Sequence, residues 1–154
     1  MKFSTREDIE APIDFVWQQI SDIGAFERQA MRRGADVRRR DSGPVQQGSA
    51  WDVDFVFRGK DRKLVVTMAT FDAPNAIHLD AEGTGLEGQM TVDLVPLTPH
   101  RTRFAVAIEL RAKTLSARLL LQSLKLAKAN LTHRFKTRVA DYSEEIERRQ
   151  GRKA

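Results

Sequence analysis

Hydrophobic and polar positions change their spacing along the chain, and the changes divide it into three parts. Residues 2–10 alternate weakly, and behind Pro12 the apolar residues recur every three or four positions. This pattern predicts a strand that leads into a short helix, with proline at the first turn. A second short helix is predicted for residues 25–33, ending at Gly34. From about residue 35 to residue 113 the period is two, and after that it returns to three and four.

The middle part predicts a series of half-buried strands. Every second residue is apolar in four runs, at 51–57, 77–81, 90–94 and 104–110. Turn-forming residues such as Gly59, Pro74 and Gly83 separate the runs. Because the connections are short, neighbouring strands must be antiparallel. Between residues 62 and 71 both parities are apolar, so the pattern leaves the inward side of that strand open.

The last part predicts one long amphipathic helix, since residues 114–150 contain neither Gly nor Pro. Its apolar stripe consists of Leu120, Leu124, Ala127, Leu131, Phe135, Val139, Tyr142 and Ile146. No other predicted helix is long enough to cover this stripe, which leaves the concave face of the sheet. We therefore expect one α+β domain over residues 1–154. Its curved antiparallel sheet of about six or seven strands grips the C-terminal helix, and two short helices follow the first strand.

Composition narrows the class of protein. At 154 residues the chain can bury an ordinary core as a single domain. The absence of cysteine excludes disulfides, thiolate metal sites and thiol nucleophiles, and fits a reducing compartment. The first residues are charged before an apolar segment can form, and no apolar run approaches the roughly 20 residues of a spanning helix. We expect a cytoplasmic protein without a transmembrane segment.

Three short stretches of the sequence carry a family resemblance: residues 9–17 (IEAPIDFVW), 20–22 (ISD) and 48–51 (GSAW). They resemble the START-like helix-grip superfamily, also called SRPBCC, in its polyketide cyclase/dehydrase and lipid-transport branch. The order of the predicted elements is similar to that of the family over essentially the whole chain. Members bind lipids, sterols, plant hormones or polyketides, and some catalyse cyclisation or hydroxylation. The resemblance therefore implies a fold and a ligand-binding cavity, but it does not select a function.

A curved sheet around one helix leaves an apolar concavity, the usual form of a small-molecule site. We expect a small hydrophobic ligand, lipid or polyketide-like, to bind there without a cofactor. The predicted ligand-binding residues, from the apolar parity of the strands and from the helix, are Trp51, Phe55, Phe57, Met68, Leu79, Met90, Phe104, Ile108, Leu120, Ser123, Leu124 and Leu131. For each residue taken singly, ordinary core packing is the competing interpretation.

The sequence gives little support for a catalytic or metal site. The three histidines, His78, His100 and His133, lie on separate elements without the spacing of metal ligands, so no metal is expected. The alternative function, a polyketide cyclase, aromatase or dehydratase, needs a polar group inside the cavity, and His133 and Asp54 are the candidates. Asp54 shares with Asp52, Asp93 and Glu109 the parity that alternates with apolar residues; on that parity the four carboxylates are expected to face solvent.

Basic residues are concentrated in two places. Six arginines lie between residues 28 and 40, and residues 113–154 hold 11 Lys and Arg against 4 Asp and Glu. No aromatic residues are interleaved with the arginines, so no specific nucleic-acid site is predicted. A solvated basic edge, peripheral contact with an anionic surface, and docking as an accessory protein remain as alternatives. The sequence allows a monomer or a homodimer.

Overall fold

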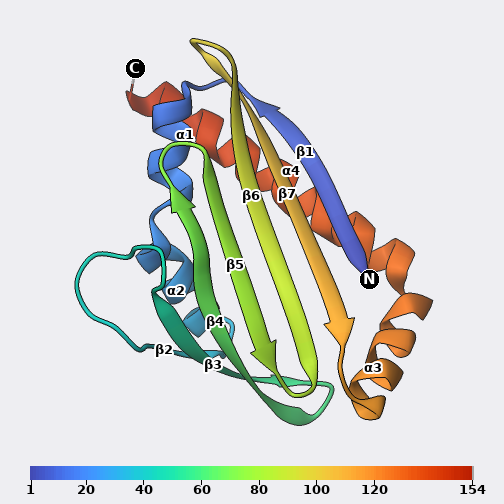
Figure 1. Cartoon of the computed structure of the whole chain (residues 1–154). Helices are drawn as coiled ribbons and strands as arrows, with labels where there is room; N and C mark the ends of the chain where they lie inside the picture. The colour runs from blue at the N-terminus through green and yellow to red at the C-terminus, as the bar shows by residue number, and fades with distance from the viewer. Residues whose placement is uncertain (154) are drawn as a thin grey trace.

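The computed structural model describes residues 1–153, which form seven strands and four helices. The strands are β1 (Lys2–Ile9), β2 (Asp36–Arg39), β3 (Ala50–Phe57), β4 (Lys60–Asp72), β5 (Ala76–Gly83), β6 (Leu86–Thr98) and β7 (Arg101–Ala112). They make one antiparallel sheet in the order β1-β7-β6-β5-β4-β3-β2, so the first strand pairs with the last (Figure 1). The predicted α+β fold, with its curved antiparallel sheet, is confirmed.

Two short helices, α1 (Ile13–Ile20) and α2 (Ile23–Arg32), connect β1 to β2, as predicted. Pro12 precedes α1, where a missing N–H leaves no helical bond unmade. The carboxylate of Asp22 caps α2 by accepting a hydrogen bond from the backbone N–H of Ala25 at 3.2 Å. Helix α1 packs against β6 and β7, and α2 packs against β2.

The C-terminal segment consists of two helices, α3 (Leu115–Leu126) and α4 (Lys128–Lys153), where the sequence predicts one. Helix α3 ends at Ala127, whose φ of −106° and ψ of 16° depart from helical values. The change of direction lets α3 pack on β7 and α4 pack on β1 (Figure 1). One straight helix could not follow the curved sheet in this way, whereas two helices can. Neither of them, nor any other helix in residues 1–153, is both long and apolar enough to cross a bilayer.

A β-bulge settles which side of β4 faces inward. Met68 pairs with Leu79, but the next partner of β5, His78, pairs with Thr70, so Ala69 is the extra residue. The bulge reverses the alternation, and Phe71 therefore lies on the same face as Met68. The bulge accounts for the inward position of Phe71, whereas Val65 is an apolar residue of the outer face.

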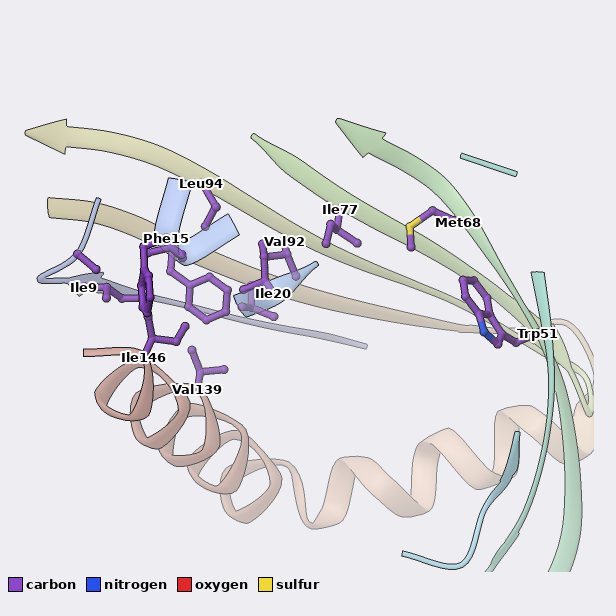
Figure 2. Packing of buried hydrophobic residues seen from close by; sticks show 14 residues of the cluster. Ile9, Phe15, Ile20, Trp51, Met68, Ile77, Val92, Leu94, Val139 and Ile146 are labelled. Atoms are coloured by element: carbon purple, nitrogen blue, oxygen red, sulfur yellow. The ribbon is translucent and has the colours of Figure 1, made fainter. Parts of the chain in front are cut away.

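Most of the buried core lies at one end of the concave face. Ile9, Val16 and Ile146 are fully buried there, where α1 and the C-terminal half of α4 meet the sheet. Figure 2 shows the side chains of Ile9, Phe15 and Ile146 gathered between the strands and α4, while Trp51 lies apart from them. Close packing therefore fixes one end of the sheet and leaves the other end less filled.

Candidate functional site

The less filled end of the concave face carries a row of apolar side chains. Register partners run across five strands as Phe3, Ile108, Met90, Leu79 and Met68, and cross-strand partners project from the same face of a sheet. Only Met68 in this row is fully buried; the other four remain partly accessible. The ring of Phe135 on α4 lies 6.1 Å from that of Phe3 and covers the row at the β1 edge.

The C-terminal helices cover this end incompletely. Helix α4 packs mainly on β1, and α3 packs on β7. Apolar side chains of the strands and of both helices therefore remain partly accessible on this side of the sheet. We call this group of half-buried residues the open end; it consists of Phe55, Met90, Ile108, Leu120, Leu124 and Leu131. Apolar side chains that remain partly exposed on a concave face are suited to bind an apolar molecule.

The twelve predicted ligand-binding residues divide into three groups. Trp51, Met68 and Phe104 belong to the buried core. Phe57 is 38 % exposed at the end of β3. The remaining eight are half-buried: Phe55, Leu79, Met90, Ile108, Leu120, Ser123, Leu124 and Leu131. The strand members all occupy the concave parity, so the structure brings the predicted strand residues to one face.

The hairpin between β3 and β4 reaches α3 at the open end. The guanidinium of Arg58 donates a hydrogen bond to the hydroxyl of Ser123. The Arg58 and Arg62 guanidinium carbons lie 5.7 and 5.9 Å from the centroid of the Phe57 ring, within the range of cation–π contacts. Basic and aromatic groups together therefore border the open end where hairpin and helix meet.

Two buried N–H groups on the concave side of β2 and β3 have no hydrogen-bond partner among the described residues. They are the Nε of Arg39 and the Nε1 of Trp51, and these residues are register partners. A buried donor without an acceptor costs about 1–3 kcal/mol, so each site favours an oxygen from a bound molecule or water. In the sequence, Arg39 is one of six arginines in a basic stretch. Its parity with Val37 was the signal that it faces inward.

All three arginines at 38–40 are paired with carboxylates. Arg38 pairs with Asp36 and Asp54. Arg40 holds Asp52 through two hydrogen bonds of 2.9 and 2.8 Å, which lower the pKa of that carboxyl. These pairs lie on the outer face of β2 and β3, so this part of the basic stretch is largely neutralised.

Neither catalytic candidate lies at the open end. Asp54 is on the outer face of β3, and His133 is exposed on α4. His78 and Asp93 are 3.0 Å apart, also on the outer face. Within residues 1–153 no three His, Asp or Glu side chains are grouped closely enough to hold a metal ion.

Two hollows lie on the outer, convex face of the sheet, away from the open end. The first, of about 370 Å³, is lined mainly by polar residues of β4 to β7, among them Asp80, Glu87 and Arg111. The second, of about 380 Å³, involves Arg6 and Asp93. Thr67 lines the first hollow and therefore faces away from the open end.

Comparison with solved structures finds close agreement in fold at low sequence identity. The protein TTHA0849 from Thermus thermophilus is 14 % identical, with a TM-score of 0.65 over 95 % of this chain and 97 % of that one. The Zhui aromatase/cyclase from Streptomyces sp. R1128 is 14 % identical, with a TM-score of 0.65 over 97 % of this chain and 94 % of that one. A START superfamily protein from Mycobacterium smegmatis is 16 % identical, with a TM-score of 0.53 over 86 % of this chain and 95 % of that one.

No protein-family model matches the chain, and neither does any curated protein. Identities of 14–16 % carry the architecture and not the chemistry. The site must therefore be interpreted from the residues of this chain.

Proposed function

Because the chain has the START-like helix-grip fold, we propose that it binds and carries a small hydrophobic molecule at the open end of the concave face. The observation that carries this is the half-burial of apolar side chains, including Met90, Ile108 and Leu124, on an inward face. A ligand that covered them would remove apolar surface from water, at about 25 cal/mol for each Å². The absence of cysteine supports a cytoplasmic setting for such a carrier.

The ligand is proposed to carry an oxygen acceptor as well as an apolar body. The unpartnered N–H groups of Arg39 and Trp51 would each donate a hydrogen bond to a carbonyl, hydroxyl or carboxylate oxygen. A fatty acid or an oxygenated polyketide has this combination of groups, whereas a pure hydrocarbon lacks it. The two donors therefore favour an amphiphilic ligand.

The alternative, a cyclase, aromatase or dehydratase, needs a proton-transferring group beside the ligand. The positions of His133 and Asp54, outside the open end, give it no support. Carriage remains the better explanation of an inward face lined by apolar side chains with two N–H donors.

The first experiment is native mass spectrometry of the protein purified from its own host, followed by denaturing extraction. We expect a stoichiometric, oxygen-containing hydrophobic passenger. If the purified protein carries nothing and takes up neither fatty acids nor aromatic polyketides in a subsequent screen, carriage is wrong.

A variant with a larger side chain at the open end tests where the ligand binds. Leu124→Trp places a larger side chain on the inner side of α3 and is expected to weaken binding of the extracted passenger at least about tenfold. Leu119→Trp, on the outer side of the same helix and 57 % exposed, is the matched control and should bind as the parent does. Equal affinities of the two variants would place the ligand elsewhere.

The Trp51→Phe variant tests the polar anchor, since it removes one N–H group and keeps an aromatic ring. We expect about a tenfold loss of affinity for an oxygen-containing passenger. A matched ligand without the oxygen should bind both proteins equally. If the variant loses the two ligands to the same extent, Trp51 contributes packing and not a hydrogen bond.

A further inference from the structure

The outer side of α3 carries a stripe of exposed leucines. Leu115, Leu119 and Leu126 are 73, 57 and 92 % exposed. A helix advances about 100° per residue, so these three lie within about 40° of arc. The buried Ala117 and Leu121 lie on the other side of α3. Single exposed leucines are ordinary, but a stripe of three on one short helix is a patch.

Helix α3 is therefore apolar on two opposite sides. Its inner side contributes Leu120 and Leu124 to the open end. Its outer side packs on no strand or helix of the described residues strongly enough to bury the leucine stripe. A surface outside the chain is the remaining candidate to cover that stripe.

The charged residues of the segment that carries the stripe are all basic. Residues 113–140 contain seven Lys and Arg and no Asp or Glu. Lys113 is paired with two glutamates of β5 and β6. Arg118, Lys125 and Lys128 are exposed and form no ion pair with any other residue of 1–153. Arg118 and Lys125 lie together along one edge of the leucine stripe, by the same helical geometry.

We propose that α3 docks on a membrane surface containing anionic lipids, with the leucine stripe inserted at the boundary between headgroups and acyl chains. Interfacial helices combine an apolar face with Lys and Arg in this way. Each basic residue near an anionic surface adds about 1 kcal/mol of attraction. A second copy is the less suitable occupant, because a symmetric contact through this face would bring like charges together.

Docking through α3 places the helix that borders the open end at the membrane surface. Exchange of a ligand between bilayer and protein would then require only a short transfer around this helix. This exchange rests on the proposed function; the docking itself does not, and it can be measured on protein without ligand.

The test is flotation of the ligand-free protein with two kinds of vesicle. One is phosphatidylcholine alone, and the other is equal parts of phosphatidylcholine and phosphatidylglycerol. We expect binding to the anionic vesicles only, weakened by salt. Replacing Leu119 and Leu126 together by serine should reduce it at least about tenfold. Replacing Arg118 and Lys125 by alanine should reduce it about fivefold for each charge removed.

Two controls match these variants. Val95→Ser removes an exposed apolar side chain at the far end of β6, and Arg32→Ala removes an exposed charge on α2 that forms no ion pair within the described part of the chain. Both should bind anionic vesicles as the parent does, and circular dichroism verifies that every variant is folded.

Four outcomes would overturn the docking proposal. Three concern vesicle binding: no binding to anionic vesicles, binding that does not depend on the leucines, and an equal loss of binding in the Arg32→Ala control. The fourth is a dimer in sedimentation that the leucine variant converts to a monomer, which would assign the stripe to self-association. Failure of docking leaves the passenger experiment unaffected, so the two proposals can fail separately.

Discussion

Arg58 and Ser123 lie 65 positions apart in the chain, and their side chains are joined by a hydrogen bond between the β3–β4 hairpin and α3. Arg58 and Gly59 have positive φ angles of 52° and 75°, as in the tight turns that match the twist of an antiparallel pair. The turn thereby directs the Arg58 guanidinium toward α3. The hydrogen bond joins the β3–β4 hairpin to α3, the two elements that border the candidate site.

Loss of this hydrogen bond is expected to make the β3–β4 hairpin more mobile and to leave the fold intact. Ser123→Ala removes a partly exposed hydrogen bond, so we expect a change of no more than about 1 kcal/mol in the free energy of unfolding. Backbone amides of the β3–β4 hairpin should exchange faster in hydrogen-exchange mass spectrometry. Ser116→Ala, elsewhere on α3, is the control. Unchanged exchange in the hairpin would mean that the contact restrains nothing.

The docking of α4 on the sheet should account for a large share of stability. Ile146 is fully buried among core residues, and Ile146→Ala is expected to lower the free energy of unfolding by about 2–5 kcal/mol. Leu126→Ala, at a position 92 % exposed, should change it by no more than about 0.5 kcal/mol. Urea denaturation of both variants measures the difference. Similar losses in the two would contradict the assignment of inner and outer sides.

The alternation of apolar residues predicted β3, β5, β6 and β7 and the side of each that faces inward, and the short connections predicted their antiparallel pairing. Alternation failed between residues 62 and 71, because Val65 is apolar on the outer face and the bulge at Ala69 adds a residue that periodicity cannot show. It also failed at Ala127, where no Gly or Pro marks the end of α3. That break depends on the curvature of the sheet, which is a property of the tertiary structure.

The candidate site could be predicted in its apolar part only. The parity of Phe55, Met90 and Ile108 follows directly from alternation, whereas their degree of burial depends on how far the helices cover them. The inward position of Arg39 was missed because a charged residue in a basic stretch is ordinarily solvated. Only the pairing of β2 with β3 turns it toward Trp51.

The Asp41 carboxylate should make stability depend on acid pH. It accepts hydrogen bonds from the Arg39 guanidinium at 2.8 Å, the Ser49 hydroxyl at 2.8 Å and the Ala50 N–H at 3.2 Å, which hold the pKa of Asp41 well below its usual range. A depressed pKa contributes stability that is present above the unfolded value of about 3.9 and is lost as the pH falls through the folded value.

Asp41→Asn should therefore be less stable than the parent near neutral pH, with the difference narrowing below about pH 4. Urea midpoints measured from about pH 6 down to pH 3 test this. Asp61→Asn is the control, because Asp61 is exposed and has no ion pair among residues 1–153. A difference between parent and Asp41→Asn that stayed constant over this range would show that the ionised carboxylate is not the stabilising form.

The single tyrosine, Tyr142, lies on α4, and titration of its phenol measures how deeply this side chain is buried. Tyr142 packs against the rings of Phe26 and Phe104, with centroids 5.9 and 6.0 Å away, and burial raises the pKa of its phenol to about 12. A raised pKa contributes stability that is complete below the unfolded value of about 10 and is lost as the pH rises through the folded value. Phenolate absorbance in the near ultraviolet should therefore rise with a midpoint near 12, with Tyr142→Phe as the blank. Circular dichroism at each pH shows whether the fold persists. A midpoint near 10 in a folded protein would mean that the phenol is solvated and that the aromatic cluster is not packed as described.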